Sequence, residues 1–229
     1  MREREAEAGR LVVFEGPEGA GKSTQLARAA EWLRARGERV RVVREPGTSP
    51  VGHEIRRLVL DGPDVAPAAE ALLFMAARAQ LVAGELRPAL AAGETVLCDR
   101  FFLSTYAYQI HGRELPEAEV VTANRLATGG LAPDLTLLVR IPPSVGLERA
   151  ARRGAHDRIE RAGDAFHARV GAAFERFATP AWQAGHPECG PIVTVDGTGD
   201  EQAVFDRVIA ALAARWPRLA AEADRGAPE

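Results

Sequence analysis

The sequence predicts an open α/β fold built on a parallel sheet. Five short apolar runs alternate with segments in which apolar residues recur at helical spacing. Each run is hydrophobic almost throughout, which is typical of strands buried on both faces of a parallel sheet. A chain of 229 residues, of which 46% are apolar, is long enough to bury the core of such a domain. The expected strands are Leu11–Phe14, Val40–Val43, Thr95–Cys98, Leu135–Val139 and Ile192–Val195.

Helices are expected between and after these strands, in segments with helical periodicity and typical start and stop residues. The first of them follows the first strand closely and is closed by Gly37. Because strands and helices alternate, ligands are expected beyond the carboxyl ends of the strands. The expected helices are Lys22–Arg36, Val51–Leu60, Pro67–Ala83, Pro116–Thr128, Ser144–Arg153, Asp164–Phe177 and Asp200–Arg215.

The chain is expected to form a single domain over residues 11–215, because no linker or internal repeat divides it. Residues 1–10 and 216–229 are expected to be flexible tails. The segment ERAARRGAHDRIERAGD stands out because it carries five arginines around two glycines. It predicts an arginine-rich lid at about residues 149–163.

Composition limits the partners and the compartment. A net charge of −3 and a pI near 6.0 argue against a broadly basic surface for nucleic acid. Two cysteines, Cys98 and Cys189, are too few for a disulfide scaffold. The charged start of the chain does not resemble a secretory signal, and no apolar run approaches the length of a membrane span. We therefore expect a cytoplasmic protein with neither a nucleic-acid nor a membrane partner.

A phosphate-binding loop (P-loop) is indicated directly after the first strand. The residues there follow the pattern Gly16-x4-Gly21-Lys22-Ser23, and a helix is expected to begin at its end. Glycines let backbone N–H groups point at phosphate oxygens, and the helix N-terminus adds a positive partial charge. The expected ATP site comprises Gly16, Pro17, Glu18, Gly19, Ala20, Gly21, Lys22, Ser23 and Thr24.

Lys22 is the only lysine in the chain, and every other basic side chain except histidine is arginine. A compact ammonium fits inside the loop against the β- and γ-phosphates, where a planar guanidinium is too broad. Ser23 offers a hydroxyl to Mg²⁺. A glycine-rich turn without a ligand is the structural alternative, but it does not require this complete pattern.

Three classes of P-loop protein can be compared. A regulatory GTPase needs a lysine-containing guanine-reading motif, and no second lysine exists. A motor or remodelling ATPase usually ends an apolar strand in acidic residues, whereas here Arg100 follows Asp99. A small-molecule kinase needs arginines for its acceptor, and the chain supplies them at Arg44, Arg56, Arg78, Arg100 and in the lid.

The nature of the acceptor can be argued from what is missing around it. A hydroxyl acceptor needs a positioned base, whereas a phosphate monoester, with a second pKa of about 6, is already a nucleophile at neutral pH. Abundant arginine and no obvious base constellation favour a nucleoside monophosphate kinase. The histidines show no metal-ligand spacing and are expected on the surface or in packing; they are His53, His111, His156, His167 and His186.

Four stretches in order, FEGPEGAGKSTQ, REPGTSPVGHEIRRLVL, EALLFMAARAQ and CDRFFLSTYAYQ, resemble bacterial thymidylate kinases. Later stretches such as RRGAHDRIE continue the resemblance, which spans about residues 11–215. It implies an α/β P-loop kinase that transfers phosphate from ATP, with Mg²⁺, to dTMP in dTTP biosynthesis. It also implies a homodimer formed through helices.

The resemblance assigns roles around the phosphates. Glu18 faces the deoxyribose 3′-hydroxyl in this comparison, and Arg44, Arg56 and Arg100 contact the acceptor phosphate. Asp99 lies near Mg²⁺, although it could instead only orient Arg100. Solvated loop or helix charges are the structural alternatives for Glu18 and Arg56.

The resemblance also assigns a base pocket. Phe74 is the platform on which thymine stacks, and Arg78 donates to thymine O4, where cytosine carries an amino donor instead. Ala77 replaces an aspartate often found before Arg78, which removes a possible partner of that arginine. Core packing is the alternative role for Phe74, and a purely structural role is the alternative for the four residues that follow. The pocket is completed by polar contacts from Ser104, Thr105 and Gln109 and by the ring of Tyr108, which crowds a ribose 2′-position.

Thymidylate kinases carry a catalytic arginine either in the P-loop or in the lid, so the resemblance implies that the lid supplies this charge here, where the P-loop interior holds no basic residue. Arg153 and Arg149 are the leading candidates, followed by Arg158. A solvated basic helix end is the structural alternative. Two other functions remain open at this point: a deoxynucleoside kinase on the same scaffold, and a nucleotide-binding regulatory protein without a working acceptor site.

Overall fold

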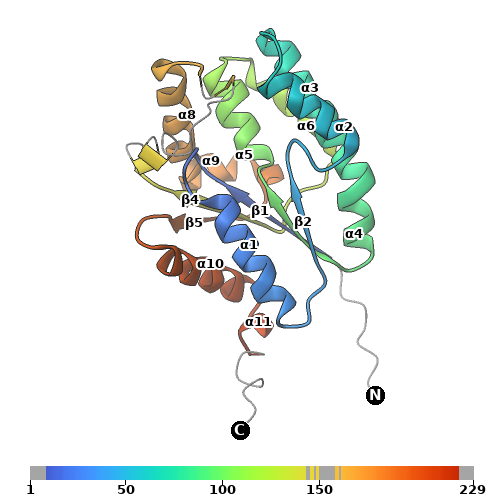
Figure 1. The fold of residues 1–229 in the computed structure, drawn as a ribbon, viewed down its shortest axis with the longest axis vertical. Coiled ribbons are helices and arrows are strands. Elements are labelled where there is room, and N and C mark those ends of the chain that lie inside the picture. Colours follow the sequence, from blue (N-terminus) through green and yellow to red (C-terminus); the bar gives the residue numbers. More distant parts are fainter. Residues whose placement is uncertain (1–8, 143–144, 147, 150–157, 160, 222–229) are drawn as a thin grey trace.

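In the computed structural model, five strands form one sheet in the order β2-β3-β1-β4-β5, and every pairing is parallel (Figure 1). The structure describes residues 9–142, 145–146, 148–149, 158–159 and 161–221. The predicted α/β fold with a five-stranded parallel sheet is therefore confirmed. The strands are β1 (Arg10–Glu15), β2 (Val40–Arg44), β3 (Thr95–Asp99), β4 (Leu135–Arg140) and β5 (Ile192–Asp196).

Each strand ends one residue later than its apolar run, on a charged residue at the carboxyl edge of the sheet. The apolar pattern records only the residues that pack against helices, whereas the backbone ladder continues past them. Register places Asp99 beside Phe14 on one side and beside Arg44 on the other. The charged strand ends of β1, β2 and β3 therefore lie next to one another.

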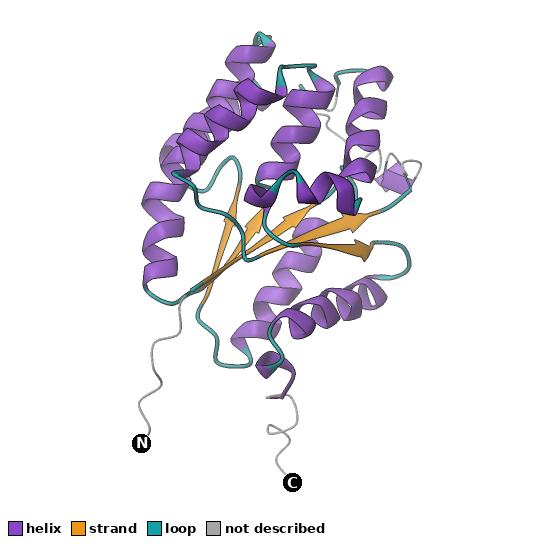
Figure 2. Cartoon of the chain, turned by 180° about the vertical axis from the view of Figure 1, so that it is seen from behind, coloured by secondary structure: helices purple, strands orange, loops and turns teal. Residues whose placement is uncertain are grey.

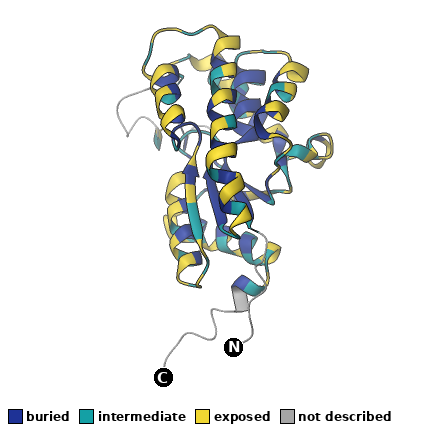
Figure 3. Ribbon diagram, turned by 90° about the vertical axis from the view of Figure 1, so that its right-hand side faces the viewer, coloured by how far each residue is buried: buried dark blue, intermediate teal, exposed yellow. Residues whose placement is uncertain are grey.

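Helices cover both faces of the sheet (Figure 2). Alternate residues of β1 pack on opposite faces, because side chains along a strand alternate in direction. Leu11 and Val13 belong to the core cluster that includes α5, η2 and α8 residues, whereas Val12 and Phe14 pack with α1 and α10 residues. The sheet is thus buried between two helical layers (Figure 3).

The edge strands depart from the prediction that all strands are buried on both faces. Val42 of β2 is 44% exposed and Val193 of β5 is 38% exposed. An edge strand has a neighbour on one side only, so its helical cover is incomplete. The central strands β1, β3 and β4 are buried along nearly their whole length.

The helical elements follow the predicted order. One layer contains α1 and α10 with the short α11, and the other contains the elements of the larger core cluster. Ser49 caps α2 by accepting from Gly52 N–H at 3.0 Å. Their bounds are α1 (Lys22–Arg34), α2 (Pro50–Leu60), α3 (Pro67–Leu81), η1 (Val82–Leu86), α4 (Arg87–Ala91), α5 (Phe102–Thr105), η2 (Tyr106–Gly112), α6 (Glu117–Thr128), α8 (Asp164–Phe177), α9 (Pro180–Ala184), η3 (Pro187–Cys189), α10 (Glu201–Arg215) and α11 (Arg218–Ala221).

The structure contains more helix than the sequence predicts in two places. The helix beginning at Pro67 continues past Ala83 through the π-helical η1 into α4, so the prediction ended it too early. Gly84 and Pro88 suggest a break, but both are accommodated within the continuing helical run. The helical run of α5 and η2 was not predicted, because its residues are nearly all buried and show no polar face. The predicted helix Ser144–Arg153 lies largely outside the described residues.

Both ends of the described chain extend past the limits expected for the domain. Arg10 is the first residue of β1 and is buried, although residues 1–10 were expected to be a tail. Leu219 of α11 is also buried, within the stretch 216–229 expected to be the second tail. Within the described residues, every helix is too short or too polar to cross a bilayer.

Candidate active site

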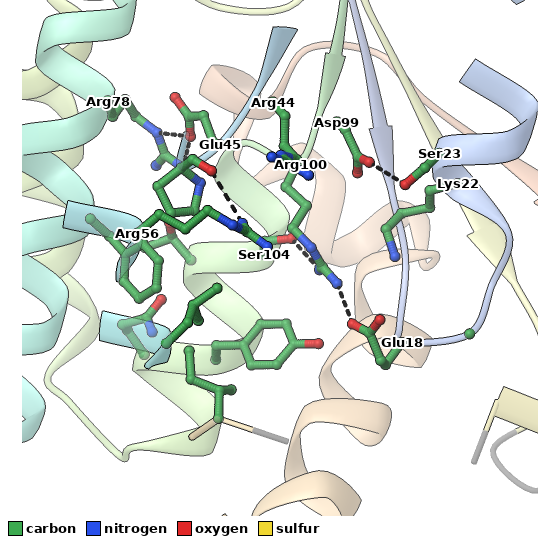
Figure 4. Close-up of a pocket in the computed structure, with 18 of the residues that line it drawn as sticks. Glu18, Lys22, Ser23, Arg44, Glu45, Arg56, Arg78, Asp99, Arg100 and Ser104 are labelled. Carbon is green, nitrogen blue, oxygen red and sulfur yellow. Dashed lines mark hydrogen bonds and ion pairs between the residues drawn. The ribbon is translucent and has the colours of Figure 1, made fainter. Parts of the chain in front are cut away.

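A cavity of about 490 Å³ opens at the carboxyl ends of β1, β2 and β3 (Figure 4). Lys22 and Ser23 lie on one side of it, Arg78 and Glu45 lie on the other, and Arg100 lies between them. Most of the residues predicted for the site line this one cavity. They are Glu18, Gly19, Gly21, Lys22, Ser23, Thr24, Arg44, Arg56, Phe74, Arg78, Asp99, Arg100, Ser104, Thr105, Tyr108, Gln109 and Arg149.

The P-loop connects β1 to α1 through glycines that no larger residue could replace without strain. Gly16 has φ 142°, and a Cβ on it would lie 2.2 Å from the carbonyl oxygen of Val139. Gly21 has φ 85° and precedes the first residue of α1. Because Gly21 has no side chain, it does not cap the N–H groups in the first turn of α1. These N–H groups can then donate to a phosphate at the helix N-terminus. Pro17 and Ala20 belong to the loop but do not line the cavity.

Lys22 lies buried inside this loop. Its Nζ donates to the carbonyl oxygens of Gly16 at 2.9 Å and Pro17 at 2.8 Å. Burial, and after it the positive charge of Arg100, lowers the pKa of Lys22 to about 8. An anionic ligand in the cavity would offset both effects, so the site favours a phosphate beside this ammonium.

Ser23, in the first turn of α1, contacts Asp99, the last residue of β3. The Ser23 hydroxyl donates to Asp99 Oδ2 at 2.6 Å. A hydroxyl and a carboxylate oxygen side by side are the hard oxygen ligands that Mg²⁺ prefers, so this pair fits a magnesium ion. Among the described residues, the hydrogen bonds of the Arg100 side chain go to Ser104 and Glu18 and not to Asp99. The contact with Ser23 therefore favours the interpretation that Asp99 lies near Mg²⁺ over the one in which it only orients Arg100.

Arg100 is held between two side chains that come from different parts of the chain. Its Nη1 donates to Ser104 Oγ at 3.0 Å, and its Nη2 donates to Glu18 Oε2 at 2.7 Å. The ring of Tyr108 lies 5.4 Å from its guanidinium carbon. The guanidinium is therefore fixed in the middle of the cavity, next to the carboxylate predicted to face a sugar hydroxyl.

Arg78 has partners that the sequence did not predict. Its Nε and Nη2 donate to Glu45 Oε2 at 2.7 and 2.5 Å, Nη2 also donates to Phe101 O at 2.8 Å, and Nη1 donates to Asn124 Oδ1. Burial, only partly offset by Arg78, raises the pKa of Glu45. The loss of an aspartate at Ala77 thus leaves Arg78 well paired, because Glu45 and Asn124 orient it.

The Arg78 contacts also limit what it can offer a ligand. A guanidinium carries five N–H groups, and the contacts with Glu45, Asn124 and Phe101 use four of them. Within the described part of the chain, these bonds leave one N–H on Nη1 for a ligand oxygen.

Phe74 and Gln109 also line the cavity, and Phe74 lies one helical turn before Arg78 on α3. Phe74 also packs against the small α2–α3 core cluster, together with Ile159. Gln109 Nε2 donates to Glu70 Oε1 at 3.1 Å, so its orientation is set by a buried carboxylate of α3. Thr105 lies one turn before Gln109 on the helical run of α5 and η2.

The second strand and the helix after it contribute two arginines. Arg44 ends β2 and is exposed, whereas Arg56 lies on α2 and donates from Nη1 to Pro46 O at 3.2 Å. The peptide bond between Glu45 and Pro46 is cis. Both arginines line the cavity (Figure 4).

The two described lid arginines, Arg149 and Arg158, differ in whether they line the cavity. Arg149 lines the cavity, with Nη1 3.5 Å from the carbonyl oxygens of Gly19 and Gly197. Arg158 does not line it; its guanidinium donates to Val59 O at 2.9 Å and to Glu70 Oε2 at 2.5 Å. Arg153, the other leading candidate, lies outside the described residues. His167, expected on the surface or in packing, also lines the cavity.

Sequence reasoning assigned no role to two buried carboxylates beside the cavity. Glu15 is fully buried and accepts hydrogen bonds from Phe101 and Ser104. Glu45 pairs with Arg78. Both occur in stretches that carried the family resemblance; Glu15 directly follows an apolar run, and Glu45 lies two residues after one. A charged residue at such a strand end was the signal that could have identified them.

The cavity combines an anion-binding loop, an oxygen pair suited to Mg²⁺ and a line of arginines. Such an arrangement can hold two phosphorylated ligands end to end and offset their mutual repulsion. The residues at the Phe74 end can enclose a flat ring with few hydrogen-bond donors.

Comparison with known proteins gives the family. A family model described as thymidylate kinase matches residues 14–184. The thymidylate kinase of Deinococcus radiodurans is 47% identical over 210 residues, which cover 90% of this chain and 98% of the relative. The thymidylate kinase of Geobacter sulfurreducens is 43% identical over 218 residues, covering 92% and 99% respectively. With the predicted P-loop and acceptor-side residues lining one cavity, this similarity shows that the chain belongs to the thymidylate kinase family.

Proposed function

We propose that this chain transfers the γ-phosphate of MgATP to dTMP, giving ADP and dTDP on the route to dTTP. One observation carries the proposal: the P-loop lysine and the arginines predicted for the acceptor line the same cavity. A phosphate monoester needs cationic neighbours and no general base to act as the nucleophile. The reaction is then an in-line transfer between two bound phosphates.

The donor end binds ATP through the P-loop residues 16–24. Lys22 and the loop N–H groups hold the β- and γ-phosphates, and Gly19 and Gly21 let the backbone approach them. Ser23 and Asp99 would hold Mg²⁺, for which their adjacent oxygens are suited. When bound, the ion neutralises charge on the transferring phosphate.

The acceptor phosphate lies between Arg100, Arg44 and Arg56. Guanidinium groups bind phosphate dianions in a bidentate fashion, which fixes the direction of attack as well as the charge balance. Glu18 holds Arg100 from the other side and faces the 3′-hydroxyl of the deoxyribose. Catalysis here is mainly positioning and charge stabilisation.

The base end selects thymine by shape and by one donor. Phe74 stacks on the ring, and the remaining Nη1 N–H of Arg78 donates to O4. Cytosine presents an amino donor at that place, so it leaves this N–H unpaired and is rejected. Thr105, Gln109 and Ser104 complete the polar contacts, and Tyr108 crowds a ribose 2′-hydroxyl.

The lid supplies further positive charge from Arg149 and Arg153. Their approach to the transferring phosphoryl group stabilises its developing charge and excludes water. The family resemblance further supports a homodimer in the cytoplasm.

A panel of nucleoside monophosphates, assayed with MgATP for ADP release, tests the proposal. We expect dTMP to be the preferred acceptor, dCMP to be poor, and Lys22→Ala to abolish transfer. Transfer to thymidine alone would indicate a deoxynucleoside kinase. ATP binding with no transfer to any monophosphate would indicate a regulatory nucleotide-binding protein. Either result would reject the proposed reaction.

A further inference from the structure

Glu15 is a buried carboxylate to which the proposed reaction gives no role. It is the last residue of β1, directly before the P-loop, and it is 0% exposed. A carboxylate removed from water is strongly disfavoured unless hydrogen bonds replace its lost hydration. Three donors do so here, and all of them belong to residues that follow β3.

These bonds join the end of β1 to the start of α5. Glu15 Oε1 accepts from the N–H of Phe101 at 2.7 Å and from the N–H of Ser104 at 3.0 Å. Oε2 accepts from the Ser104 hydroxyl at 2.6 Å. Arg100, immediately before Phe101, has φ 71°, a left-handed conformation that non-glycine residues rarely adopt. The N–H of Arg100 donates to Phe14 O at 3.0 Å. Residues 14 and 15 therefore accept the N–H groups of two successive residues of this turn, Arg100 and Phe101.

The chemistry of the three side chains sets the direction of every bond between them. A carboxylate only accepts, a guanidinium only donates, and a hydroxyl has one proton and two lone pairs. The Ser104 proton must therefore point at Glu15, and a Ser104 lone pair must face Arg100 Nη1 at 3.0 Å. Glu15 thus makes Ser104 a pure acceptor towards the guanidinium.

We propose that Glu15 is a positioning residue for the acceptor phosphate, acting through Ser104 on the guanidinium of Arg100. The carboxylate never touches the nucleotide. It holds the turn that carries Arg100 and orients the hydroxyl that fixes Nη1. This inference rests on the proposed function, because it takes Arg100 as the contact of the dTMP phosphate.

The test compares Glu15→Gln with the unmodified chain in binding dTMP and thymidine by calorimetry. The glutamine oxygen can still accept from the two backbone N–H groups, but its amide nitrogen then faces Ser104 as a donor. The hydroxyl can accept from both the amide and Arg100, but its own proton loses the carboxylate that oriented it, so Ser104 is no longer fixed as the acceptor of Arg100 and the guanidinium is held less firmly. We expect dTMP binding to weaken about tenfold, as loss of one charge-assisted bond predicts. Thymidine, which lacks the phosphate, should bind within about twofold of normal.

Kinetics and a matched control complete the design. KM for dTMP should rise about tenfold, whereas KM for ATP should stay within about twofold. Glu188→Gln is the control, because Glu188 accepts from Tyr106 on the same helical run but does not line the cavity. It should leave dTMP binding unchanged. The double variant Glu15→Gln/Ser104→Ala should be no worse than the poorer single variant, since both act along one path.

If dTMP and thymidine binding weaken equally, Glu15 only supports the fold, and the inference is overturned. If dTMP binding is unchanged, Glu15 has no role in holding the acceptor, and the inference is overturned as well. If Glu15→Gln does not fold, Glu15→Asp, whose shorter side chain draws the carboxylate away from Ser104, is judged by the same selective loss of dTMP binding, and equal or absent losses overturn the inference again. An unmodified chain that binds dTMP without phosphorylating it would reject the proposed reaction alone. An unmodified chain that does not bind dTMP would reject both.

Discussion

At the scale of single residues, Lys22 combines a positive charge with burial. It is 6% exposed and donates to two carbonyl oxygens of its own loop. With the pKa of Lys22 lowered to about 8, the folded chain without nucleotide binds this proton less tightly than the unfolded chain, whose lysine keeps the ordinary pKa of 10.5. Between these two pH values the unfolded state holds more protons, so stability rises with pH.

Comparison of the unmodified chain with Lys22→Met isolates this contribution. From pH 7 to pH 10 the stability of the unmodified chain should rise by about 2 kcal/mol relative to the variant. Urea denaturation at both pH values measures the difference. A constant difference would show that Lys22 keeps an ordinary pKa in the free protein. The variant should be inactive at every pH, because no other lysine exists to replace the ammonium.

Arg78 gives a second prediction at this scale. Its ion pair with Glu45 is buried, with side chains 4% and 7% exposed. Arg78→Ala leaves a carboxylate buried without its counter-charge, and we expect a loss of about 3–5 kcal/mol in the free energy of unfolding. Arg78→Ala/Glu45→Gln should recover part of that loss, which thermal or urea denaturation would detect. A double variant no more stable than Arg78→Ala would contradict the pairing.

At the scale of elements, Glu70 of α3 joins three segments of the chain. It is 0% exposed and accepts from Gln109 of η2, from Arg113 after η2 and from Arg158. Burial by itself raises the pKa of Glu70, but hydrogen bonds from Arg113 and Arg158 outweigh it and lower the pKa below the ordinary 4.5. Arg158 therefore anchors the segment expected to form the lid to α2 and α3, and it does not line the cavity.

Glu70→Gln should loosen this junction. We expect a loss of about 2–4 kcal/mol at pH 7, because two arginines lose their shared counter-charge. Since the folded pKa is lowered, the contribution of Glu70 is present above pH 4.5 and disappears as pH falls through the folded pKa. The difference between variant and unmodified chain should shrink below pH 4.5. Urea denaturation at pH 7 and near pH 3.5 tests this, and a pH-independent difference would contradict it.

At the scale of the whole molecule, α3 and α6 pack together and present leucines outward. Leu72 of α3 is 62% exposed and Leu126 of α6 is 85% exposed. Large exposed apolar side chains on two packed helices suit a contact surface. The helices α3 and α6 lie at the end of the sheet occupied by β2, away from β5 (Figure 1).

The proposed homodimer should use this helical surface. Leu72→Glu/Leu126→Glu is expected to convert a dimer to a 24.5 kDa monomer in sedimentation velocity. Val193→Glu, on the edge strand β5, is the control and should leave the dimer intact. A dimer that survives the double leucine change would exclude these helices as its interface.

The sequence alone determined the α/β class, the order of the strands along the chain and the phosphate-binding loop. These features depend on local periodicity and on the spacing of a few neighbouring residues, which can be seen without coordinates. The ordered stretches of family resemblance also identified most of the residues that line the cavity.

Only the tertiary structure decided which buried charges meet. Glu45 lies 33 residues from Arg78, and Glu15 lies 89 residues from Ser104, so no local pattern could pair them. The same holds for the helical run of α5 and η2, whose burial on nearly all sides removes the polar face by which helices are recognised. A buried charge is tolerated only where the fold brings donors to it, and those donors come from strands and helices that are distant in the chain.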